Sequence, residues 1–302
     1  MATIKALVLR AAGTNCDRET AFALQQAGFT TSREHVFRLM EDPSKLDDAQ
    51  FLVIPGGFSY GDDIASGKIL ANQMLHRLSE PLNRFVQAGK LVLGICNGFQ
   101  VMLKSGLLPW GNVSPDQAHL DATLAWNDVG RFQDRWIHLR ADSDKCVFVP
   151  KGEVLALPIA HGEGKFIARD ASVLERLRTD DQVALRYVDE NGAPGPYPIN
   201  PNGSNDDIAG ICDATGRVMG LMPHPERFID ITQHPQWTRR QIKRAELIPG
   251  DLLFRGDGKD FYHVGVYVGD GRVVEAKGRD DGVVLTFRHW GEQAERLGRS
   301  AG

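Results

Sequence analysis

Short apolar runs alternate with amphipathic stretches over the first hundred residues of the chain. Runs of aliphatic and β-branched residues at 4–9, 51–54 and 91–95 have the length and composition of buried strands. Helical apolar spacing begins near Arg18 and recurs over 64–88. Because strands that alternate with helices usually pair in parallel, the pattern predicts an α/β fold, with a mostly parallel sheet and helices on both faces.

The pattern changes to strands and turns between Ser114 and Asp213, which predicts an antiparallel elaboration of the sheet. A late apolar run, 218–222, then reads as a strand that places the segment 223–226 beyond its carboxyl end. In parallel sheets ligands lie beyond these ends. From the point where this pattern stops, we divide the chain into a domain of residues 1–240 and a small β-rich extension of residues 241–302.

Composition narrows the functional classes. The 302 residues include 42% hydrophobic and 25% charged residues, which is ordinary for a globular protein, and no apolar run reaches the ~18 residues of a membrane helix. The start of the chain does not resemble a secretory signal, so we expect a cytoplasmic protein. A net charge of −4 argues against nucleic-acid binding, which needs clustered cations.

The four cysteines are far apart in the sequence and form no CxxC pair, so we expect reduced thiols and no metal site. One of them stands out. Cys96 follows a buried-type strand and precedes a predicted helix, with Gly94 and Gly98 where a sharp turn needs small residues. A helix N-terminus favours thiolate and offers N–H groups to an oxyanion, so Cys96 is a candidate nucleophile; an inert buried thiol is the alternative.

A cysteine nucleophile needs a base and a group that orients the base. His224 and Glu226 offer an imidazole and a carboxylate two positions apart after a strand. In an extended segment the two side chains project to the same side, whereas Pro225 can impose a turn instead. The alternative interpretation is a loop histidine beside an unrelated surface acid.

Five segments together carry a family resemblance: GTNCD at 13–17, PGGFSYGDD at 55–63, GICNGFQ at 94–100, AHGEGKF at 160–166 and PHPER at 223–227. In this order they resemble a class I glutamine amidotransferase and, more narrowly, the glutaminase subunit of phosphoribosylformylglycinamidine synthase. The resemblance covers roughly residues 5–238 and implies a flavodoxin-like domain. It also implies a function: hydrolysis of glutamine to glutamate and ammonia, which a synthetase uses in purine biosynthesis.

The resemblance assigns roles to individual residues. Cys96 attacks the glutamine amide and forms a thioester, and His224, oriented by Glu226, transfers protons. The oxyanion and substrate are expected at Gly56, Gly57 and Asn97, with the backbone amides of the last two as donors.

The resemblance also implies partners. They are an ATP-dependent synthetase subunit and, in some systems, a small third subunit. No GxxxxGK[ST] loop occurs in the sequence, so we expect no cofactor in this chain, with ATP and Mg²⁺ on the synthetase.

Two matched segments stay outside the predicted catalytic set. The 161–164 segment reads by composition as a flexible turn with an exposed histidine, whereas the resemblance places it near the active site or the synthetase interface. Cys16 has no base nearby in sequence, so we expect a role in packing or in the turn.

The extension after residue 240 does not resemble the glutaminase ending. Over about 45 residues from Ile248 it resembles part of an NlpC-type cysteine peptidase, with His263 matching the base and Glu275 the orienting residue. That family has its cysteine at a helix start upstream, whereas Cys212 reads as a hairpin edge. A peptidase activity is therefore disfavoured. The alternatives to the glutaminase function are an NlpC-like peptidase and a non-catalytic binding or regulatory relic with an altered C-terminus.

Overall fold

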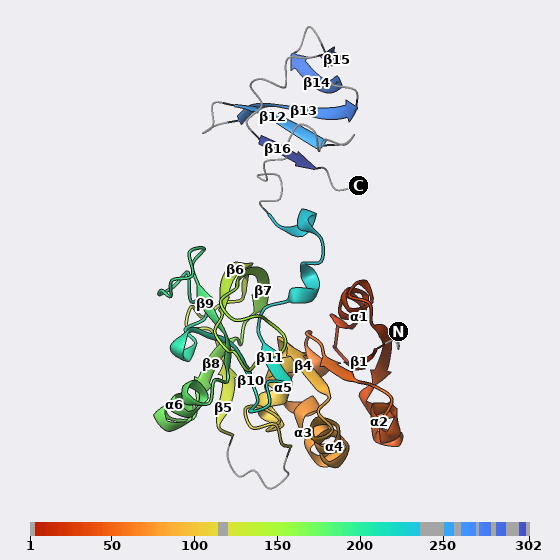
Figure 1. Ribbon diagram of the computed structural model, residues 1–302, viewed down its shortest axis with the longest axis vertical. Coiled ribbons are helices and arrows are strands. Elements are labelled where there is room, and N and C mark those ends of the chain that lie inside the picture. The colour runs from red at the N-terminus through yellow and green to blue at the C-terminus, as the bar shows by residue number, and fades with distance from the viewer. Residues whose placement is uncertain are drawn as a thin grey trace. The chain divides into compact units, whose positions relative to one another are not determined.

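The protein is represented by a computed structural model that describes residues 4–113, 120–235, 251–256, 261–269, 272–278, 282–287 and 296–299. The chain divides into two compact units, Met1–Arg227 and Phe228–Gly302, which are described separately. The first unit contains a nine-stranded sheet and the second a five-stranded sheet (Figure 1).

One half of the nine-stranded sheet is parallel. In spatial order its strands are β2 (Thr30–His35), β1 (Lys5–Arg10), β3 (Phe51–Ile54), β4 (Leu91–Ile95) and β11 (Val218–Leu221). Every residue of β3 and β11 is buried, as expected of central strands that are covered on both faces. The predicted flavodoxin-like α/β architecture is therefore confirmed.

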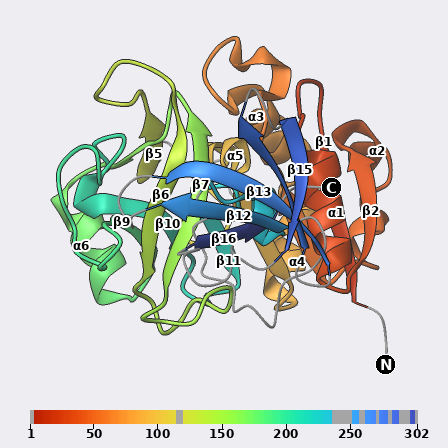
Figure 2. The ribbon, with the colours of Figure 1, turned by 90° about the horizontal axis from the view of Figure 1, so that it is seen from above.

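The predicted antiparallel elaboration continues the same sheet. From β11 it proceeds through β10 (Ile208–Cys212), β9 (Val183–Val188), β6 (Gln133–Ala141) and β7 (Val154–His161). Figures 1 and 2 show these strands on the side of the unit away from β1 and β2. A separate antiparallel pair joins β5 (Ala122–Ala125) to β8 (Lys165–Ala168).

The described residues form six α-helices, including two that the sequence did not predict, at 36–41 and 171–179. They are α1 (Asp17–Gln26), α2 (Val36–Glu41), α3 (Lys68–Arg77), α4 (Ser79–Gln87), α5 (Asn97–Lys104) and α6 (Ala171–Thr179). Helix α1 packs against β1 and β2, and α5 packs against β3, β4 and β11. The interval 64–88 holds two helices rather than one continuous one. Proline is tolerated in the first turn of a helix but not in its interior, so Pro81 favours a new helix start at Ser79.

The hairpin at Cys212 is confirmed, but its position at an edge is not. Strand β10 pairs with β11 on one side and with β9 on the other, and Cys212 is completely buried. Local sequence shows a strand and its turn but not the order of strands in the sheet. The prediction of an edge was therefore wrong.

The second unit contains an antiparallel sheet in the order β15, β14, β13, β12, β16. The strands are β12 (Asp251–Gly256), β13 (Phe261–Gly269), β14 (Arg272–Gly278), β15 (Gly282–Phe287) and β16 (Arg296–Arg299). The predicted β-rich extension is thus confirmed, with hairpins that connect neighbouring strands in sequence from β12 to β15.

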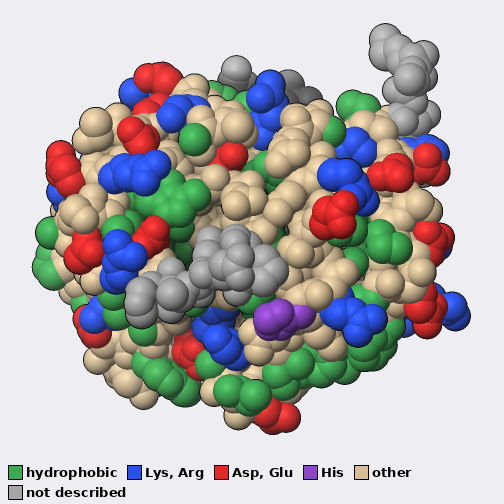
Figure 3. Space-filling view, turned by 90° about the horizontal axis from the view of Figure 1, so that it is seen from below, with side chains coloured by type: hydrophobic (Ala, Val, Ile, Leu, Met, Phe, Trp, Pro, Cys, Tyr) green, Lys and Arg blue, Asp and Glu red, His purple; other side chains and the backbone are tan. Residues whose placement is uncertain are grey.

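The described helices and one face of the surface bear on membrane and nucleic-acid binding. Among the described helices none has the length and apolarity to cross a bilayer, and the longest, α1 and α3, have ten residues each. On the face shown in Figure 3, acidic and basic side chains are interspersed rather than collected in one basic patch. That face offers no electrostatic footprint for a nucleic acid.

Candidate active site

Cys96 lies in a sharp turn between β4 and α5. Its backbone angles, φ 50° and ψ −106°, are strained for a residue with a side chain and present the sulfur at the start of the helix. The turn requires close packing of backbone: a Cβ atom at Gly98 would lie 1.9 Å from the carbonyl oxygen of Ile54, and one at Gly94 would lie 2.9 Å from the carbonyl carbon of Gly98. The two glycines therefore permit the turn that the sequence predicted.

His224 and Glu226 follow the strand beside Cys96. Strand β11 pairs in parallel with β4, and the Cys96 N–H donates to the Leu221 carbonyl at 2.8 Å. Pro225 begins a short 3₁₀ turn, Pro225–Arg227. Of the two conformations that the sequence allowed, extended or turned, the segment therefore adopts the turn. Within it Glu226 Oε1 lies 2.6 Å from His224 Nδ1, with both side chains 2% exposed. Three residues predicted from distant segments thus come together.

The surroundings of His224 favour its protonated form. Burial by itself lowers the pKa of an imidazole, but Cys96, Cys16 and Glu226 act against burial, and the pKa of His224 is raised well above its ordinary value. Within the described part of the protein, His224 Nε2 is buried and has no hydrogen-bond partner. A protonated imidazole beside a buried cysteine is the arrangement that a Cys–His nucleophile pair requires.

Gly56 and Gly57 follow β3 at the same end of the sheet. A Cβ atom at Gly56 would lie 3.5 Å from Cys96 Cβ and 2.8 Å from His224 Cε1, so a side chain here would fill the space between nucleophile and base. Gly57 has a φ of 136° and forms a bridge with Thr14, and a Cβ would lie 2.7 Å from the Asn15 nitrogen. Only glycine fits this close approach of two backbones.

Asn97 has two separate features. Its backbone N–H belongs to the first turn of α5, where N–H groups lack partners within the helix. Its side chain accepts from the Ser59 N–H at 3.2 Å and donates to Gln100 Oε1 at 2.8 Å and Asp62 Oδ1 at 3.2 Å. Asn97 therefore ties the loop after β3 to the start of α5 and leaves its own N–H available to a ligand.

The 161–164 segment lies against the site and is not a flexible exposed turn. His161 is 3% exposed, which corrects the interpretation of an exposed histidine. The Cys96 sulfur contacts the Ala160 carbonyl at 3.7 Å, and Gln100 Nε2 donates to the Glu163 carbonyl at 2.7 Å. The location near the active site, implied by the family resemblance, agrees with these contacts.

Asn127, which the sequence analysis missed, holds this segment in place. Its Nδ2 donates to the His161 carbonyl at 2.9 Å, and its Oδ1 accepts from the Gly164 N–H at 3.1 Å. The same Oδ1 lies 3.2 Å from His161 Nδ1, which we assign as the protonated nitrogen because an amide oxygen only accepts. Burial, with the nearby His224, lowers the pKa of His161 to about 3, so its ring is neutral.

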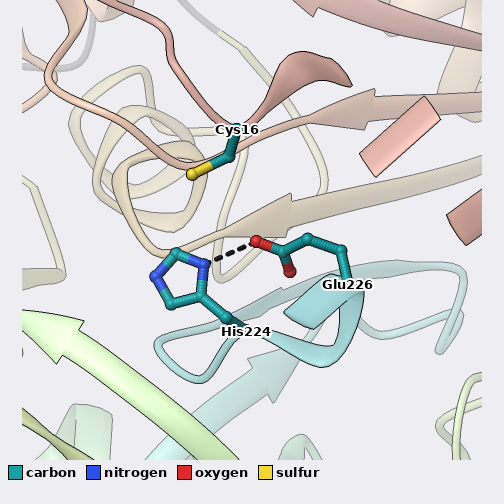
Figure 4. Close-up of side chains that lie close together, drawn as sticks. All are labelled: Cys16, His224 and Glu226. Carbon is teal, nitrogen blue, oxygen red and sulfur yellow. Dashed lines mark hydrogen bonds and ion pairs between the residues drawn. The ribbon is translucent and has the colours of Figure 1, made fainter. Parts of the chain in front are cut away.

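Cys16 also lies in the site, which sequence spacing did not indicate. It occupies the N-cap position of α1 and is 1% exposed, and Arg227 Nη2 donates to its sulfur at 3.2 Å. Burial raises the pKa of the Cys16 thiol, while His224 and Arg227 act in the opposite direction. Figure 4 shows Cys16 close to the pair formed by His224 and Glu226, which comes from a segment far away in sequence. All four cysteines are described, and all are free thiols.

The two residues of the peptidase-like pattern belong to the second unit. His263 lies in β13 opposite Arg255, and Glu275 lies in β14 opposite Gly265. Their side chains lie outside the described part of the structure. The peptidase resemblance therefore stays a prediction.

The turn at Cys96, the buried His–Glu pair that follows the neighbouring parallel strand and the glycines after β3 come together at one end of a flavodoxin-like sheet, the arrangement predicted for a Cys–His–Glu hydrolase. The family profile of the CobB/CobQ-like glutamine amidotransferase domain matches residues 3–259. This match extends from the first unit into the second.

The most similar relatives include phosphoribosylformylglycinamidine synthase subunit PurQ of Dehalococcoides mccartyi, 43% identical over 245 residues, or 80% of this chain and 92% of the relative. The PurQ subunit of Methanococcus maripaludis is 42% identical over 254 residues, covering 82% and 90%. The solved structure of PurLQS from Thermotoga maritima contains a chain that matches with a TM-score of 0.60 and 33% identity, over 77% of this chain and 92% of that one. The chain belongs to the PurQ family of glutamine amidotransferases.

Proposed function

We propose that this chain hydrolyses glutamine to glutamate and ammonia and supplies the ammonia to phosphoribosylformylglycinamidine synthase in purine biosynthesis. The observation that carries the proposal is the hydrogen bond of 2.6 Å between His224 and Glu226, which follow the strand that pairs with the one before Cys96. An oriented base next to a helix-start cysteine is the minimum that nucleophilic attack on an amide requires.

In the proposed mechanism the Cys96 sulfur attacks the side-chain carbonyl carbon of glutamine. The C–N bond breaks as His224 gives a proton to the leaving nitrogen, so ammonia departs and a thioester remains. His224 then takes a proton from water, which attacks the thioester and releases glutamate and the thiolate. Glu226 keeps the imidazole oriented and stabilises its positive charge.

Both tetrahedral intermediates carry a negative oxygen that needs hydrogen-bond donors. We assign the backbone N–H groups of Gly57 and Asn97 to this role, with Gly56 leaving room for the substrate. The glycine at 56 faces Cys96 and His224, and Asn97 starts α5. Removal of one such donor costs ~3 kcal/mol of transition-state stabilisation.

The partner that accepts the ammonia is an ATP-dependent synthetase subunit, assisted by a small third subunit. The matching chain from Thermotoga maritima was solved as part of PurLQS, which supports an assembly of this kind. ATP and Mg²⁺ bind to the synthetase, and this chain needs no cofactor of its own. The site of the reaction is the cytoplasm, where purine nucleotides are made.

A glutamine-mimicking electrophile tests the proposal. The full chain is treated with a diazo-ketone analogue of glutamine, alone and with the synthetase subunits, and the modified peptide is identified by mass spectrometry. Label on Cys96, prevented by excess glutamine and absent from Cys96→Ser, supports the proposal. A matched Cys146→Ser variant keeps the label, because Cys146 lies outside the site. Absence of label in both conditions refutes the proposal.

A further inference from the structure

Cys16, His224 and Glu226 bring three metal-binding groups together in the interior. One ligand atom from each residue, the sulfur, a ring nitrogen and a carboxylate oxygen, lies within 4.8 Å of the other two (Figure 4). Counted as whole residues, backbone included, Cys16, His224 and Glu226 are 1%, 1% and 5% exposed. They belong to two segments: Cys16 precedes α1, whereas His224 and Glu226 lie in the segment that follows β11. Sequence spacing indicates the His–Glu pair but not the approach of Cys16 to it.

The chemistry of these groups selects among metal ions. Thiolate, imidazole and carboxylate are the ligands that Zn²⁺ uses, whereas Mg²⁺ and Ca²⁺ require oxygen ligands in larger number. Glu226 Oε2 is buried and, within the described structure, has no hydrogen-bond partner, so the carboxylate retains an oxygen that can complete the coordination. The ligand set therefore fits zinc or its spectroscopic substitute, Co²⁺.

The geometry needs little adjustment. Bond lengths of about 2.0–2.3 Å in a tetrahedral site place ligand atoms about 3.3–3.6 Å apart. The present separations, up to 4.8 Å, have to contract by about 1 Å, while the 2.6 Å contact between His224 and Glu226 opens. Gly56 leaves space beside the cluster, because a Cβ there would lie 3.2 Å from Cys16 Sγ. Arg227 can keep its hydrogen bond to the sulfur, as outer partners of metal-bound thiolates do.

We propose that Cys16, His224 and Glu226 form an inhibitory site that binds one Zn²⁺ ion. The metal displaces the proton of the Cys16 thiol and the proton that His224 Nδ1 shares with Glu226, and both protons go to solvent. The imidazole then serves as a ligand and no longer as a base. Inhibition rests on the proposed glutaminase function, whereas binding of the metal does not.

A binding experiment tests the site without reference to activity. The full-length, metal-free chain competes for Zn²⁺ with a chromophoric chelator, and Co²⁺ is followed by its thiolate charge-transfer absorption. We expect one equivalent bound. Cys16→Ser should weaken binding roughly 100-fold or more, beyond the usual loss of about 10–100-fold for an outer partner. Equal binding by Cys16→Ser and the parent chain overturns the proposal.

Two further variants separate this site from the alternatives. Cys146→Ser is a matched control, since Cys146 is a buried cysteine outside the cluster, and it should bind as the parent chain does. Cys96→Ser should retain the Co²⁺ absorption, which keeps the test valid even where Cys16→Ser fails to fold. Loss of the absorption in Cys96→Ser shows that the metal is held by Cys96 and refutes the assignment.

Activity measurements then test inhibition. With glutaminase turnover established, Zn²⁺ should inhibit the parent chain at the concentrations at which it binds, and Cys16→Ser should resist inhibition at least about tenfold. Stoichiometric binding without turnover in any preparation contradicts the proposed function but leaves the metal site standing. Turnover that Zn²⁺ inhibits equally in both chains contradicts the metal site and leaves the function standing.

Discussion

The short hydrogen bond between His224 Nδ1 and Glu226 Oε1 gives a direct test of how the base is oriented. In Glu226→Gln the amide can still contact the ring, but the negative charge is lost. Because Glu226 contributes to the raised pKa of His224, we expect that pKa to fall in the variant. We expect kcat for glutamine hydrolysis to fall roughly 10²–10⁴-fold. Steady-state kinetics and NMR titration of the histidine measure both effects.

An exposed glutamate provides the control. Glu175 lies on α6 with its side chain 69% exposed, and Glu175→Gln should leave both quantities unchanged. A Glu226→Gln variant with normal kcat contradicts the role of Glu226.

His161 makes the stability of the fold depend on pH. Its pKa is about 3 in the folded protein against an ordinary value of 6.5. As the pH falls below 6.5 the unfolded chain takes up a proton that the folded protein excludes, so this residue lowers the unfolding free energy by about 1.4 kcal/mol per pH unit down to about pH 3. Urea denaturation at several pH values between about 6.5 and 4.5 gives the unfolding free energy as a function of pH, and its slope against pH should be shallower in His161→Gln than in the parent chain.

A second variant controls for the effect of replacing any histidine on the pH dependence of the unfolding free energy. His76 is a histidine on the surface of α3, and His76→Gln should show the slope of the parent chain. The same slope in all three chains contradicts the assignment to His161.

The sequence predicts those site residues that have unusual neighbours in the sequence itself. Cys96 is conspicuous because two glycines flank it at a strand-to-helix turn, and the His-Pro-Glu spacing indicates a pair but leaves its conformation open. Cys16 and Asn127 carry no such local mark. Their importance depends on contacts with Arg227 and with the 161–164 segment, and such contacts exist only in the folded chain.

Asn127 joins two elements, the loop after β5 and the 161–164 segment after β7. Asn127→Ala removes the donor to the His161 carbonyl and the acceptor of the Gly164 N–H, which leaves buried backbone groups unpaired. We expect a loss of about 1–3 kcal/mol in the free energy of unfolding. Because Gln100 contacts this segment and Cys96 contacts the adjoining Ala160, we also expect a lower kcat.

Denaturation curves and glutaminase assays on the same preparations check both effects. Asn191 lies in an exposed turn, and Asn191→Ala should change neither quantity. Normal stability together with normal kcat in Asn127→Ala contradicts the bridging role.

At the scale of elements, runs of apolar residues predict the positions of strands well, but they predict less well which strands lie next to one another in the sheet. The strands at 5–10, 51–54, 91–95 and 218–221 lie where periodicity places them. Periodicity does not indicate that β10 is an interior strand, because strand order depends on pairing between residues far apart in sequence. It also does not show the break before α4, where the position of a proline relative to a helix start decides the outcome.

At the scale of the whole molecule, the six predicted site residues all lie in the unit Met1–Arg227. A chain that ends at residue 235 therefore retains every group assigned to catalysis. We expect it to fold and to be labelled at Cys96 by the glutamine-mimicking electrophile. Circular dichroism, thermal denaturation and peptide mass spectrometry check this expectation.

The full-length chain and Cys96→Ser in the same truncated background serve as controls. A truncated chain that folds but takes no label contradicts the independence of the site. The family profile extends to residue 259, so the experiment also shows whether the residues after 235 contribute to the site.

Strand β11 is the last strand of the first unit in sequence, yet it lies in the middle of the nine-stranded sheet, between β4 and β10. During synthesis on the ribosome, β4 and β10 therefore emerge with unpaired edges and wait for the strand that joins them. Exposed edges of this kind invite aggregation, so nascent chains that stall before Val218 should be strong clients of chaperones. The same order also delays assembly of the proposed active site. His224, the proposed base, follows β11 in sequence, so the site forms only after this last strand has joined the sheet.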